Sequence, residues 1–474
     1  MAGVNRCRSL IEEGSVYQIN LTDRFDGSLV GTPFDLYQAM ATAQGGGFNA
    51  FFDLGDVTIA SASPELFVHI DSERVTARPM KGTAPRRARS GDDEVAGCRL
   101  VESVKDRAEN VMIVDLMRND LSRLAPFGGV SVPALFEAER YETVWQLTST
   151  VQATIDPEVT LVDVLRATFP CGSVTGAPKV AAMRYIDEIE PWPRGVYCGA
   201  IGLISPNIAG DTQTRPAATF SVAIRSAVVD NSSGTVEYGA GGGVTWGSVP
   251  AAEDAELESK AVVLTECRPE FQLLETLRVE GRDPVNLEAH LRRIRSSADY
   301  FGFACDLDQA RAACSAAVAG APPVSARRMR IMLSRDGAWN VELHPLELAS
   351  TAPLRVAVAT NSVRSDDVFC CHKTTNRTVY ERVGGQHPDV DDVLLGNERG
   401  EITDSCRANL LFRCGDEWFT PPLTSGGLAG IARQQLLDSG DIHERLLHHN
   451  ELAEVDEFAL VSSLRGRRQA TVLL

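Results

Sequence analysis

The sequence predicts a mixed α/β protein, and three observations support this. Its 474 residues are too many for one ordinary domain, so two or three domains are expected. Segments with strand-like alternation, such as residues 66–70, occur among segments with helical spacing, such as residues 101–123. A short polar break at residues 267–270 separates two regions with different patterns. We therefore expect one domain over residues 1–267 and a second over residues 271–474.

The composition is that of a soluble protein with reduced thiols. Hydrophobic residues make up 44% of the chain and charged residues 23%. The net charge of −18 disfavours nucleic acid or an anionic membrane as the main partner, although local arginines or a metal can still hold an anionic small substrate. The 11 cysteines lack metal-ligand spacing and favour a reducing compartment. No signal peptide and no apolar run of about 20 residues is visible, so we expect a cytoplasmic location and no membrane span.

The first domain begins with a helix followed by a strand, over residues 7–25. Gly14 marks the end of the helix, and residues 16–22 alternate as a strand does. Residues 91–102 are polar, and we expect a loop there. This loop would lead into the helix at residues 101–123, whose apolar positions recur at helical spacing.

A lysine between turn residues is the first candidate nucleophile. Residues 79–83 read Pro-Met-Lys-Gly-Thr, with Lys81 at the centre. A lysine amine acts as a covalent nucleophile when burial or a neighbouring cation lowers its pKa. Proline and glycine mark a turn in any case, so Lys81 alone favours the simpler interpretation of an exposed lysine at a turn.

Two glycine-containing segments are typical of ligand binding. Residues 172–179 read Gly-Ser-Val-Thr-Gly-Ala-Pro-Lys, and a helix is expected to start near Pro178. Backbone N–H groups at such a helix start can hold an anion, although the spacing is not that of a phosphate loop. Residues 238–243 read Tyr-Gly-Ala-Gly-Gly-Gly between strand-like segments, which favours close approach of a ligand over a flexible turn.

Three charged residues stand at positions that need a partner. Arg225 ends an apolar strand-like segment, where a charge is costly unless it is paired, and a carboxylate substrate would pair with it through two hydrogen bonds. Glu253 and Glu256 lie on one helical face. Spacing alone favours a solvated acidic helix start for these two, while Mg²⁺ is the alternative partner for their oxygens.

These motifs resemble those of the chorismate-utilising enzymes, among them the aminodeoxychorismate synthases. The family carries Pro-Ile-Lys-Gly-Thr where residues 79–83 stand, and anthranilate synthases have a small residue in place of the lysine. Residues 172–179 match the family's Gly-Ser-x-Thr-Gly-Ala-Pro-Lys, and residues 14–21 match its Gly-Asp-Ile-Tyr-Gln-Val-Asn-Leu block. That block usually lies well inside the chain, so the family's N-terminal segment is expected to be short or missing here.

The resemblance implies large antiparallel sheets with helices and a reaction between chorismate and ammonia that gives 4-amino-4-deoxychorismate. Lys81 would attack ring carbon C2, with Glu65 as general acid/base. The resemblance also implies one set of substrate-binding residues and one set of Mg²⁺ ligands. The substrate-binding residues would be Tyr197, Arg225, Thr175, Gly176, Gly241 and Gly243. The metal ligands would be Glu109, Glu256 and Glu253. No segment with a Cys-His-Glu constellation is visible, so ammonia would come from a separate glutamine amidotransferase subunit or from solution.

The second domain resembles the class IV fold of pyridoxal-phosphate enzymes, which includes branched-chain aminotransferases and aminodeoxychorismate lyase. Residues 271–303 read as a strand, a turn and an amphipathic helix. The resemblance implies two lobes, for which residues 321–323, Ala-Pro-Pro, would be the linker. It also allows a homodimer formed through this domain.

The same resemblance implies the residues that bind pyridoxal 5′-phosphate. Lys373 matches the lysine that forms a Schiff base with the cofactor, and Arg293 matches an arginine that binds its phosphate. Asp404 stands where the family usually has a glutamate that pairs with the pyridinium nitrogen, and it is one methylene shorter. Ile431 and Ala432 lie in a helix-entry turn whose backbone N–H groups would hold the phosphate.

Taken together, the two resemblances imply a fusion that makes 4-aminobenzoate for folate by amination of chorismate and elimination of pyruvate. Two alternatives remain open. One is an anthranilate- or isochorismate-type synthase fused to a transaminase, of which Lys81 disfavours the anthranilate version. The other is a second domain that binds no cofactor and only braces the first.

Overall fold

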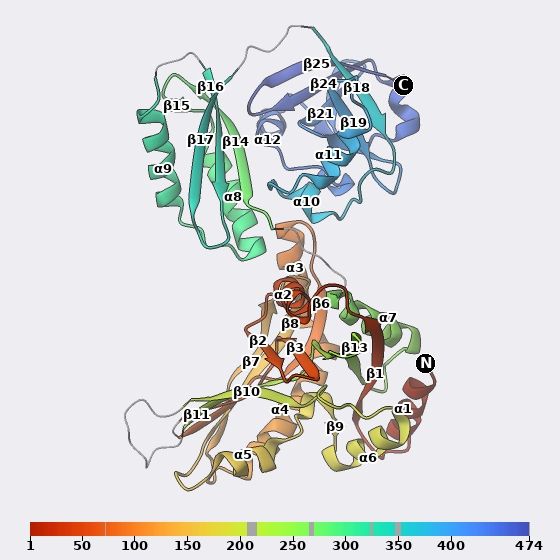
Figure 1. Ribbon diagram of the computed structural model, residues 1–474. Helices are drawn as coiled ribbons and strands as arrows, with labels where there is room; N and C mark the ends of the chain where they lie inside the picture. Colours follow the sequence, from red (N-terminus) through yellow and green to blue (C-terminus); the bar gives the residue numbers. More distant parts are fainter. Residues whose placement is uncertain (72, 206–215, 265–269, 323–325, 347–351, 474) are drawn as a thin grey trace. The chain divides into compact units, whose positions relative to one another are not determined.

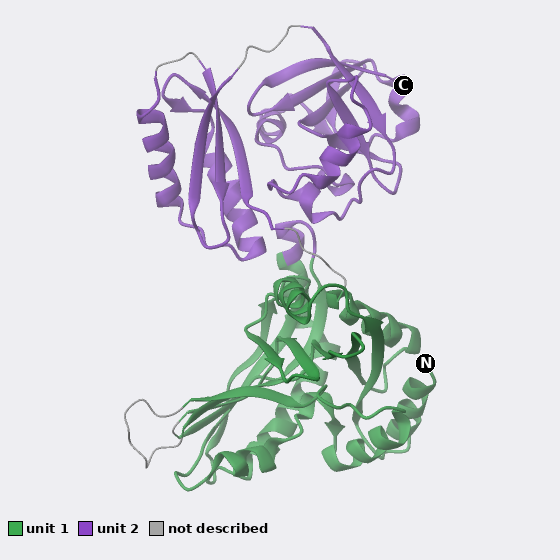
Figure 2. Cartoon of the chain, in the orientation of Figure 1, with its two compact units in different colours: residues 1–86, 94–268 green, residues 87–93, 269–474 purple. Residues whose placement is uncertain are grey.

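The chain forms two compact units (Figure 1, Figure 2). The computed structural model describes residues 1–71, 73–205, 216–264, 270–322, 326–346 and 352–473. Residues 1–86 and 94–268 make up unit 1, and residues 87–93 and 269–474 make up unit 2. Most of the predicted polar break at residues 267–270 lies outside the described residues.

Unit 1 is built on two antiparallel sheets. The first contains, in spatial order, β2 (Phe48–Asp53), β3 (Val57–Ser63), β12 (Ser226–Asp230), β13 (Thr235–Val244), β1 (Gln18–Ser28) and β9 (Gly176–Ala177). The second contains β10 (Ala200–Ser205), β11 (Ala217–Val222), β4 (Leu66–Asp71), β5 (Arg74–Ala77), β8 (Val144–Thr154) and β6 (Met80–Pro85), with β7 (Val130–Arg140) beside β8. Pairing of β1 with β13 places residues from the two ends of this unit's chain side by side.

Helices cover the sheets of unit 1. They are α1 (Ala2–Glu12), α2 (Pro33–Gln44), α4 (Val104–Ser122), α5 (Leu161–Thr168), α6 (Lys179–Ile189) and α7 (Pro250–Ala261). The predicted helix at residues 101–123 is confirmed by α4. Its residues Ile113, Met117 and Leu121 are buried in one core with Val151 of β8, because its apolar positions recur at helical spacing.

The loop predicted at residues 91–102 is wrong, because α3 (Ser90–Glu102) occupies it. Leu100 of this helix is buried against Trp145 and Leu147 of β8. Most residues of the segment are polar, and the apolar partners of Leu100 lie far away in the chain. The sequence pattern of the segment alone therefore does not predict this contact. Burial of one apolar side therefore outweighs the segment's loop-like composition.

Unit 2 contains two further sheets. The four-stranded sheet has the order β15 (Asp283–Pro284), β14 (Leu273–Glu280), β16 (Ala326–Leu333) and β17 (Trp339–Pro345). The eight-stranded sheet has the order β20 (Ile402–Ser405), β19 (Asp392–Gly396), β18 (Leu354–Ala359), β25 (Gly466–Val472), β24 (Glu457–Ser462), β21 (Asn409–Cys414), β22 (Glu417–Thr420) and β23 (His443–Glu444). Its helices are α8 (Leu287–Phe301), α9 (Leu307–Ala319), α10 (Val368–Cys371), α11 (Thr378–Gly385) and α12 (Ile431–Asp438).

Strands and helices are both substantial in each unit, which confirms the predicted mixed α/β class. The predicted linker at residues 321–323 is wrong where it is described. Ala321 and Pro322 follow α9, and β16 then pairs with β14 along its whole length, so the chain stays in the four-stranded sheet. Pro323 lies outside the described residues. None of the helices in the described ranges combines the length and the apolar character that a membrane crossing needs.

Candidate active sites

A cavity of about 220 Å³ lies in unit 1, lined by residues of β6, β13, α4 and α7. Nine of the residues predicted for catalysis, substrate binding and metal binding line it. They are Lys81, Glu65, Glu109, Tyr197, Arg225, Gly241, Gly243, Glu253 and Glu256. Residues that the sequence motifs distribute over most of unit 1 therefore meet at one place.

Thr175 and Gly176 are not among the described residues that line this cavity. The Thr175 hydroxyl donates a hydrogen bond of 3.1 Å to the carbonyl oxygen of Cys171. Gly176 has a φ of +146°, and a Cβ at this position would collide with the carbonyl oxygen of Gln18. Both residues thus shape the turn, while Ser173 of the same segment lines the cavity.

Glu65 is a buried carboxyl group next to Lys81. Burial raises the pKa of Glu65 to about 7, against the lowering effects of the Ser173 hydroxyl and of the positive charge on Lys81. Its Oε1 atom has no hydrogen-bond partner within the described part of the chain. A carboxyl group with a pKa near neutrality can give a proton to a leaving group and take one back.

Gln18 does not line the cavity but lies next to Gly243, which does, and the motifs did not single it out. Its side chain is fully buried, and neither Oε1 nor Nε2 has a partner among the described residues. Nε2 lies 2.5 Å, and the Nζ atom of Lys81 3.1 Å, from the position of a Cβ on Gly243. A buried amide without partners is costly unless a ligand supplies them, so Gln18 is a candidate ligand-binding residue. A polar residue within the apolar alternation of residues 16–22 was the available signal.

Arg225 does not end its strand as predicted. Strand β11 ends at Val222, and Arg225 follows it with a φ of +50°. Its Nη1 atom donates a hydrogen bond of 2.8 Å to the carbonyl oxygen of Lys260, which also accepts one of 2.8 Å from the Tyr238 hydroxyl. The backbone around Lys260 therefore fixes the arginine at the cavity. Pairing with a substrate carboxylate stays a prediction.

Glu109 of α4 and Glu253 and Glu256 of α7 form an acidic wall of the cavity. Burial raises the pKa of Glu109, and the negative charge of Glu253 raises it further. The positive charges of Lys105 and Lys81 act in the opposite direction. The Glu253 Oε2 and Glu256 Oε1 atoms lie 3.2 and 3.7 Å from the position of a Cβ on Gly242. Mg²⁺ prefers such carboxylate oxygens, so the donor chemistry fits. Among the described residues, however, no three acidic, histidine or cysteine side chains are gathered as closely as a metal ion needs.

A larger cavity of about 710 Å³ lies in unit 2. All five residues predicted to bind pyridoxal phosphate line it: Lys373, Arg293, Asp404, Ile431 and Ala432. They come from the connection after α10, from α8, from the end of β20 and from the start of α12. The fold therefore gathers a lysine, an acid, an arginine and a helix start around one space.

Lys373 is buried in this cavity. Burial lowers the pKa of its amine to about 8, with help from the positive charge of Arg293, and the carboxylates of Glu275 and Asp404 oppose the shift. An amine with this pKa is partly neutral at neutral pH, as a lysine that attacks a carbonyl group must be.

Asp404 is held by three donors. Its Oδ1 atom accepts a hydrogen bond of 3.1 Å from the Leu410 N–H, and its Oδ2 atom accepts bonds of 2.7 Å from Asn409 Nδ2 and 3.2 Å from the Leu428 N–H. Burial nevertheless raises the pKa of Asp404 to about 8. A cationic group in the cavity would lower this pKa, so the site suits a protonated ring nitrogen.

Arg293 is fixed next to the start of α12. Its Nε and Nη2 atoms donate hydrogen bonds of 2.7 Å each to the two carboxylate oxygens of Glu275, and Nη1 donates one of 2.7 Å to the carbonyl oxygen of Ala429. The N–H groups of Ile431 and Ala432, in the first turn of α12, have no intrahelical acceptors. An arginine beside a helix start is a favourable place for a phosphate group.

Comparison with known families identifies a match for each half of the chain. Residues 1–266 match the chorismate binding enzymes, and residues 272–473 match the class IV amino-transferases. Both resemblances inferred from the motifs are thereby confirmed.

Three individual relatives each match about half of this chain. Aminodeoxychorismate synthase component 1 of Escherichia coli is 41% identical over 250 residues, which are 53% of this chain and 53% of that protein. Anthranilate synthase component 1 of Pseudomonas aeruginosa is 36% identical over 257 residues, which are 54% of this chain and 50% of that protein. The crystal structure of anthranilate synthase component I from Streptococcus pneumoniae matches with a TM-score of 0.50 and 34% identity, over 56% of this chain and 57% of that one. The chain thus spans about half the length of the curated relatives it matches.

Proposed function

Because the chain belongs to the chorismate binding enzyme family through residues 1–266, we propose that unit 1 converts chorismate and ammonia into 4-amino-4-deoxychorismate. The observation that carries the proposal is the meeting of the Lys81 amine with the Glu65 carboxyl group in one cavity. The relatives named aminodeoxychorismate synthase component 1 support the same product.

In the first step, the Nζ atom of Lys81 forms a bond to ring carbon C2 of chorismate. The two ring double bonds shift, and the bond between C4 and its hydroxyl group breaks. Glu65 gives its proton to the departing hydroxyl, which leaves as water. Its pKa of about 7 keeps part of the carboxyl group protonated at neutral pH, as this role requires.

In the second step, ammonia forms a bond to C4. The double bonds shift back, and the bond between C2 and the lysine nitrogen breaks, so that Lys81 is regenerated. Glu65, now a carboxylate, accepts the proton that the new C4 amine loses. The sum is the exchange of the 4-hydroxyl group for an amine, with release of water.

The cavity walls would hold the substrate's two carboxylates. Arg225, fixed by the Lys260 carbonyl group, and the Tyr197 hydroxyl would bind the enolpyruvyl carboxylate, together with backbone N–H groups of the glycine run in β13. Mg²⁺ held by Glu109, Glu253 and Glu256 would neutralise and orient the ring carboxylate.

The test is product analysis with the full chain, chorismate, an ammonium salt and Mg²⁺. A 4-amino product, together with an intact-mass increase on Lys81 when ammonia is left out, would support the proposal. A 2-amino product would identify an anthranilate-type reaction instead, and an unchanged rate in Lys81→Ala would exclude the covalent role.

For unit 2 we propose the next step, elimination of pyruvate from 4-amino-4-deoxychorismate to give 4-aminobenzoate. Pyridoxal phosphate, when bound, supplies an electron sink. The Lys373 amine, with its pKa lowered to about 8, can take the proton from C4 and return a proton to the enolpyruvyl group as the C3–O bond breaks. Asp404 would hold the ring nitrogen of the cofactor, and the start of α12 its phosphate.

Conversion of added 4-amino-4-deoxychorismate to 4-aminobenzoate and pyruvate tests this second activity. Formation of a new amino acid from a 2-oxo acid would identify a transaminase. Protein that retains no cofactor and leaves the substrate unchanged would support the bracing role.

We also propose that a separate glutamine amidotransferase supplies the ammonia. Two of the curated relatives are named aminodeoxychorismate synthase component 1, which supports a second component for those two proteins. Glutamine-dependent product formation that appears only after a glutaminase subunit is added would test this supply, with ammonium salt as the control.

A further inference from the structure

The ammonium group of Lys260 is bound at the acidic wall of the unit 1 cavity. Its Nζ atom donates a hydrogen bond of 2.6 Å to Glu256 Oε1 and one of 2.7 Å to the carbonyl oxygen of Gly241. Lys260 and Glu256 lie four residues apart on α7, a spacing that lets the two side chains meet. The lysine therefore neutralises one of the carboxylates assigned to the metal.

Lys260 shares its space with both acidic residues of α7. The Glu253 Oε2, Glu256 Oε1 and Lys260 Nζ atoms lie 3.2, 3.7 and 3.8 Å from one point, the position of a Cβ on Gly242. A divalent cation that used the oxygens of Glu253 and Glu256 would bring its charge close to this ammonium group. Two cations cannot share the oxygens of Glu256 without strong repulsion.

The backbone carbonyl group of Lys260 makes contacts that are independent of its side chain. Its carbonyl oxygen accepts the hydrogen bonds from Arg225 and Tyr238, so the peptide group stays fixed by contacts that do not involve the side chain. The four-carbon side chain can leave Glu256 by rotation about its own bonds. Departure of the ammonium group therefore need not disturb the arginine.

We propose that Lys260 is the resident counter-ion of the acidic wall, which Mg²⁺ must displace from Glu256 in order to bind. The lysine keeps the carboxylates of α7 compensated while the metal is absent and lowers the affinity for the metal. Lys260 is a positioning residue in this role, since it acts through Glu256. The inference rests on the Mg²⁺ site of the proposed function and adds the group that competes with the ion.

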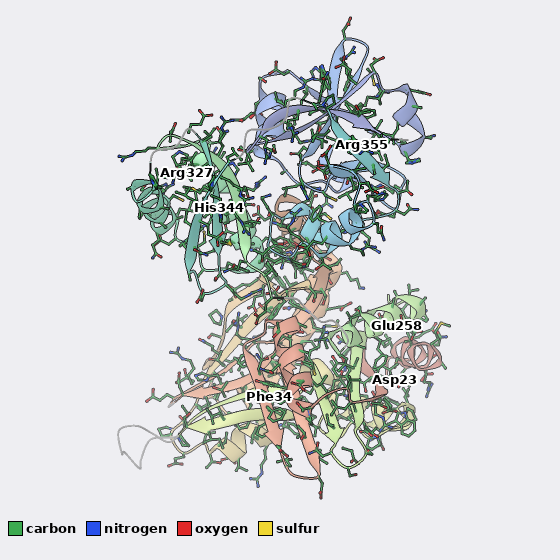
Figure 3. The ribbon with its side chains drawn as sticks, turned by 45° about the horizontal axis from the view of Figure 1, so that its top comes forward. Asp23, Phe34, Glu258, Arg327, His344 and Arg355 are labelled. Carbon is green, nitrogen blue, oxygen red and sulfur yellow. The ribbon has the colours of Figure 1, made fainter. Side chains whose placement is uncertain are left out.

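Calorimetric titration of the full chain with Mg²⁺, without chorismate, tests the competition. Lys260→Met keeps the length of the side chain and removes its charge, and we expect it to bind Mg²⁺ about fivefold more tightly. Lys260→Arg keeps the charge and should bind as the parent does. The matched control is Glu258→Gln, an exposed acidic residue of α7 that does not line the cavity (Figure 3).

A second measurement needs no variant. If Mg²⁺ displaces Lys260, acylation of its amine by a water-soluble ester should rise several-fold on addition of Mg²⁺, as measured by peptide mass spectrometry. Unchanged or weaker Mg²⁺ binding in Lys260→Met with a parental melting temperature, or acylation independent of Mg²⁺, would overturn the inference.

Failure of the two proposals can be distinguished. Tighter Mg²⁺ binding in Lys260→Met, in a protein that makes no 4-amino product, would uphold the counter-ion and overturn the proposed reaction. A parent protein that makes the product but binds no Mg²⁺ would uphold the amination and overturn both the metal site and the counter-ion.

Discussion

The amine of Lys81 and the side-chain amide of Gln18 both lie next to the α-carbon of Gly243. Lys81 Nζ lies 3.1 Å and Gln18 Nε2 2.5 Å from the position that a Cβ on this glycine would take. Strand β13 carries Gly243 past the start of β1, which holds Gln18, and β6 brings Lys81 to the same place. The missing side chain of Gly243 thus makes room for two polar groups, of which Lys81 lines the cavity.

Gly243→Ala should reduce the rate of amination about 100-fold, because the new methyl group would push Gln18 and Lys81 out of position by an ångström or so. The effect should appear in the rate of covalent adduct formation on Lys81, measured by quenched intact-protein mass spectrometry. Gly247→Ala is the control, since a Cβ there meets nothing within 4 Å. Equal rates in Gly243→Ala and the parent would contradict the assigned geometry.

Glu65→Gln should lower the amination rate between about 100-fold and 10,000-fold, since the amide cannot donate a carboxyl proton. In the parent, the proton-donating form is lost as pH rises through about 7, so the rate should fall on the alkaline side of that value. Steady-state rates between pH 5 and 9 check this. The Glu65→Gln variant should not show this fall in rate at alkaline pH. If the variant still shows it, the fall comes from the ionisation of another group.

The same carboxyl group should make the stability of unit 1 depend on pH. The pKa of Glu65 is about 7 in the folded chain against an ordinary value of 4.5, so the folded state binds more protons between these values. The free energy of unfolding therefore falls as pH rises from 4.5 to 7. Glu65→Gln removes this loss, so the stability of the variant relative to the parent should improve by about 3 kcal/mol between pH 4 and pH 8. Calorimetric unfolding of unit 1 in both proteins measures the difference, and a constant difference would refute the buried acid.

The motifs predicted residues better than they predicted contacts. The motifs and the family resemblance that they carry pointed to Lys81, Glu65 and Glu256, and these residues line one cavity. The pairing of β1 with β13 sets Asn20 opposite Gly243 and so brings the nearby Gln18 side chain next to this glycine, and no local pattern in either strand predicts this contact. Helix α3 was missed for the same reason, since Leu100 packs against residues of β8. Lys260 lies in no motif that the sequence reveals. Its hydrogen bond to Glu256 becomes visible only in the folded helix.

Lys373→Ala should stop the second step and leave the first intact, so that 4-amino-4-deoxychorismate accumulates. The variant loses the buried amine, and purified protein should lack the visible absorption of a lysine-bound cofactor. Chromatography of the products and an absorption spectrum check both effects. Lys81→Ala is the matched control, because it should keep the absorption band and make neither product. Formation of 4-aminobenzoate by Lys373→Ala at the parental rate would contradict the assignment.

Asp404 tests whether an aspartate can serve where a glutamate is usual. The shorter aspartate side chain already accepts hydrogen bonds from the Leu410 and Leu428 N–H groups. Its Oδ2 atom lies 3.2 Å from the position of a Cβ on Gly427. A longer acid would be crowded here, so Asp404→Glu should weaken cofactor retention through overpacking rather than restore it. Asp404→Asn keeps the volume and removes the charge.

Both variants should lose pyridoxal phosphate about tenfold more readily on dialysis, but only Asp404→Asn should leave the melting temperature of the cofactor-free protein unchanged or raised. In the cofactor-free protein, burial raises the pKa of Asp404 to about 8, so a neutral amide removes a group whose ionisation is unfavourable there. Asp438→Asn, at the exposed end of α12, is the control. Tighter cofactor binding by Asp404→Glu than by the parent would contradict the crowding that we infer from the hydrogen bonds of Asp404. The aspartate would then be too short to bind the cofactor as well as a glutamate does.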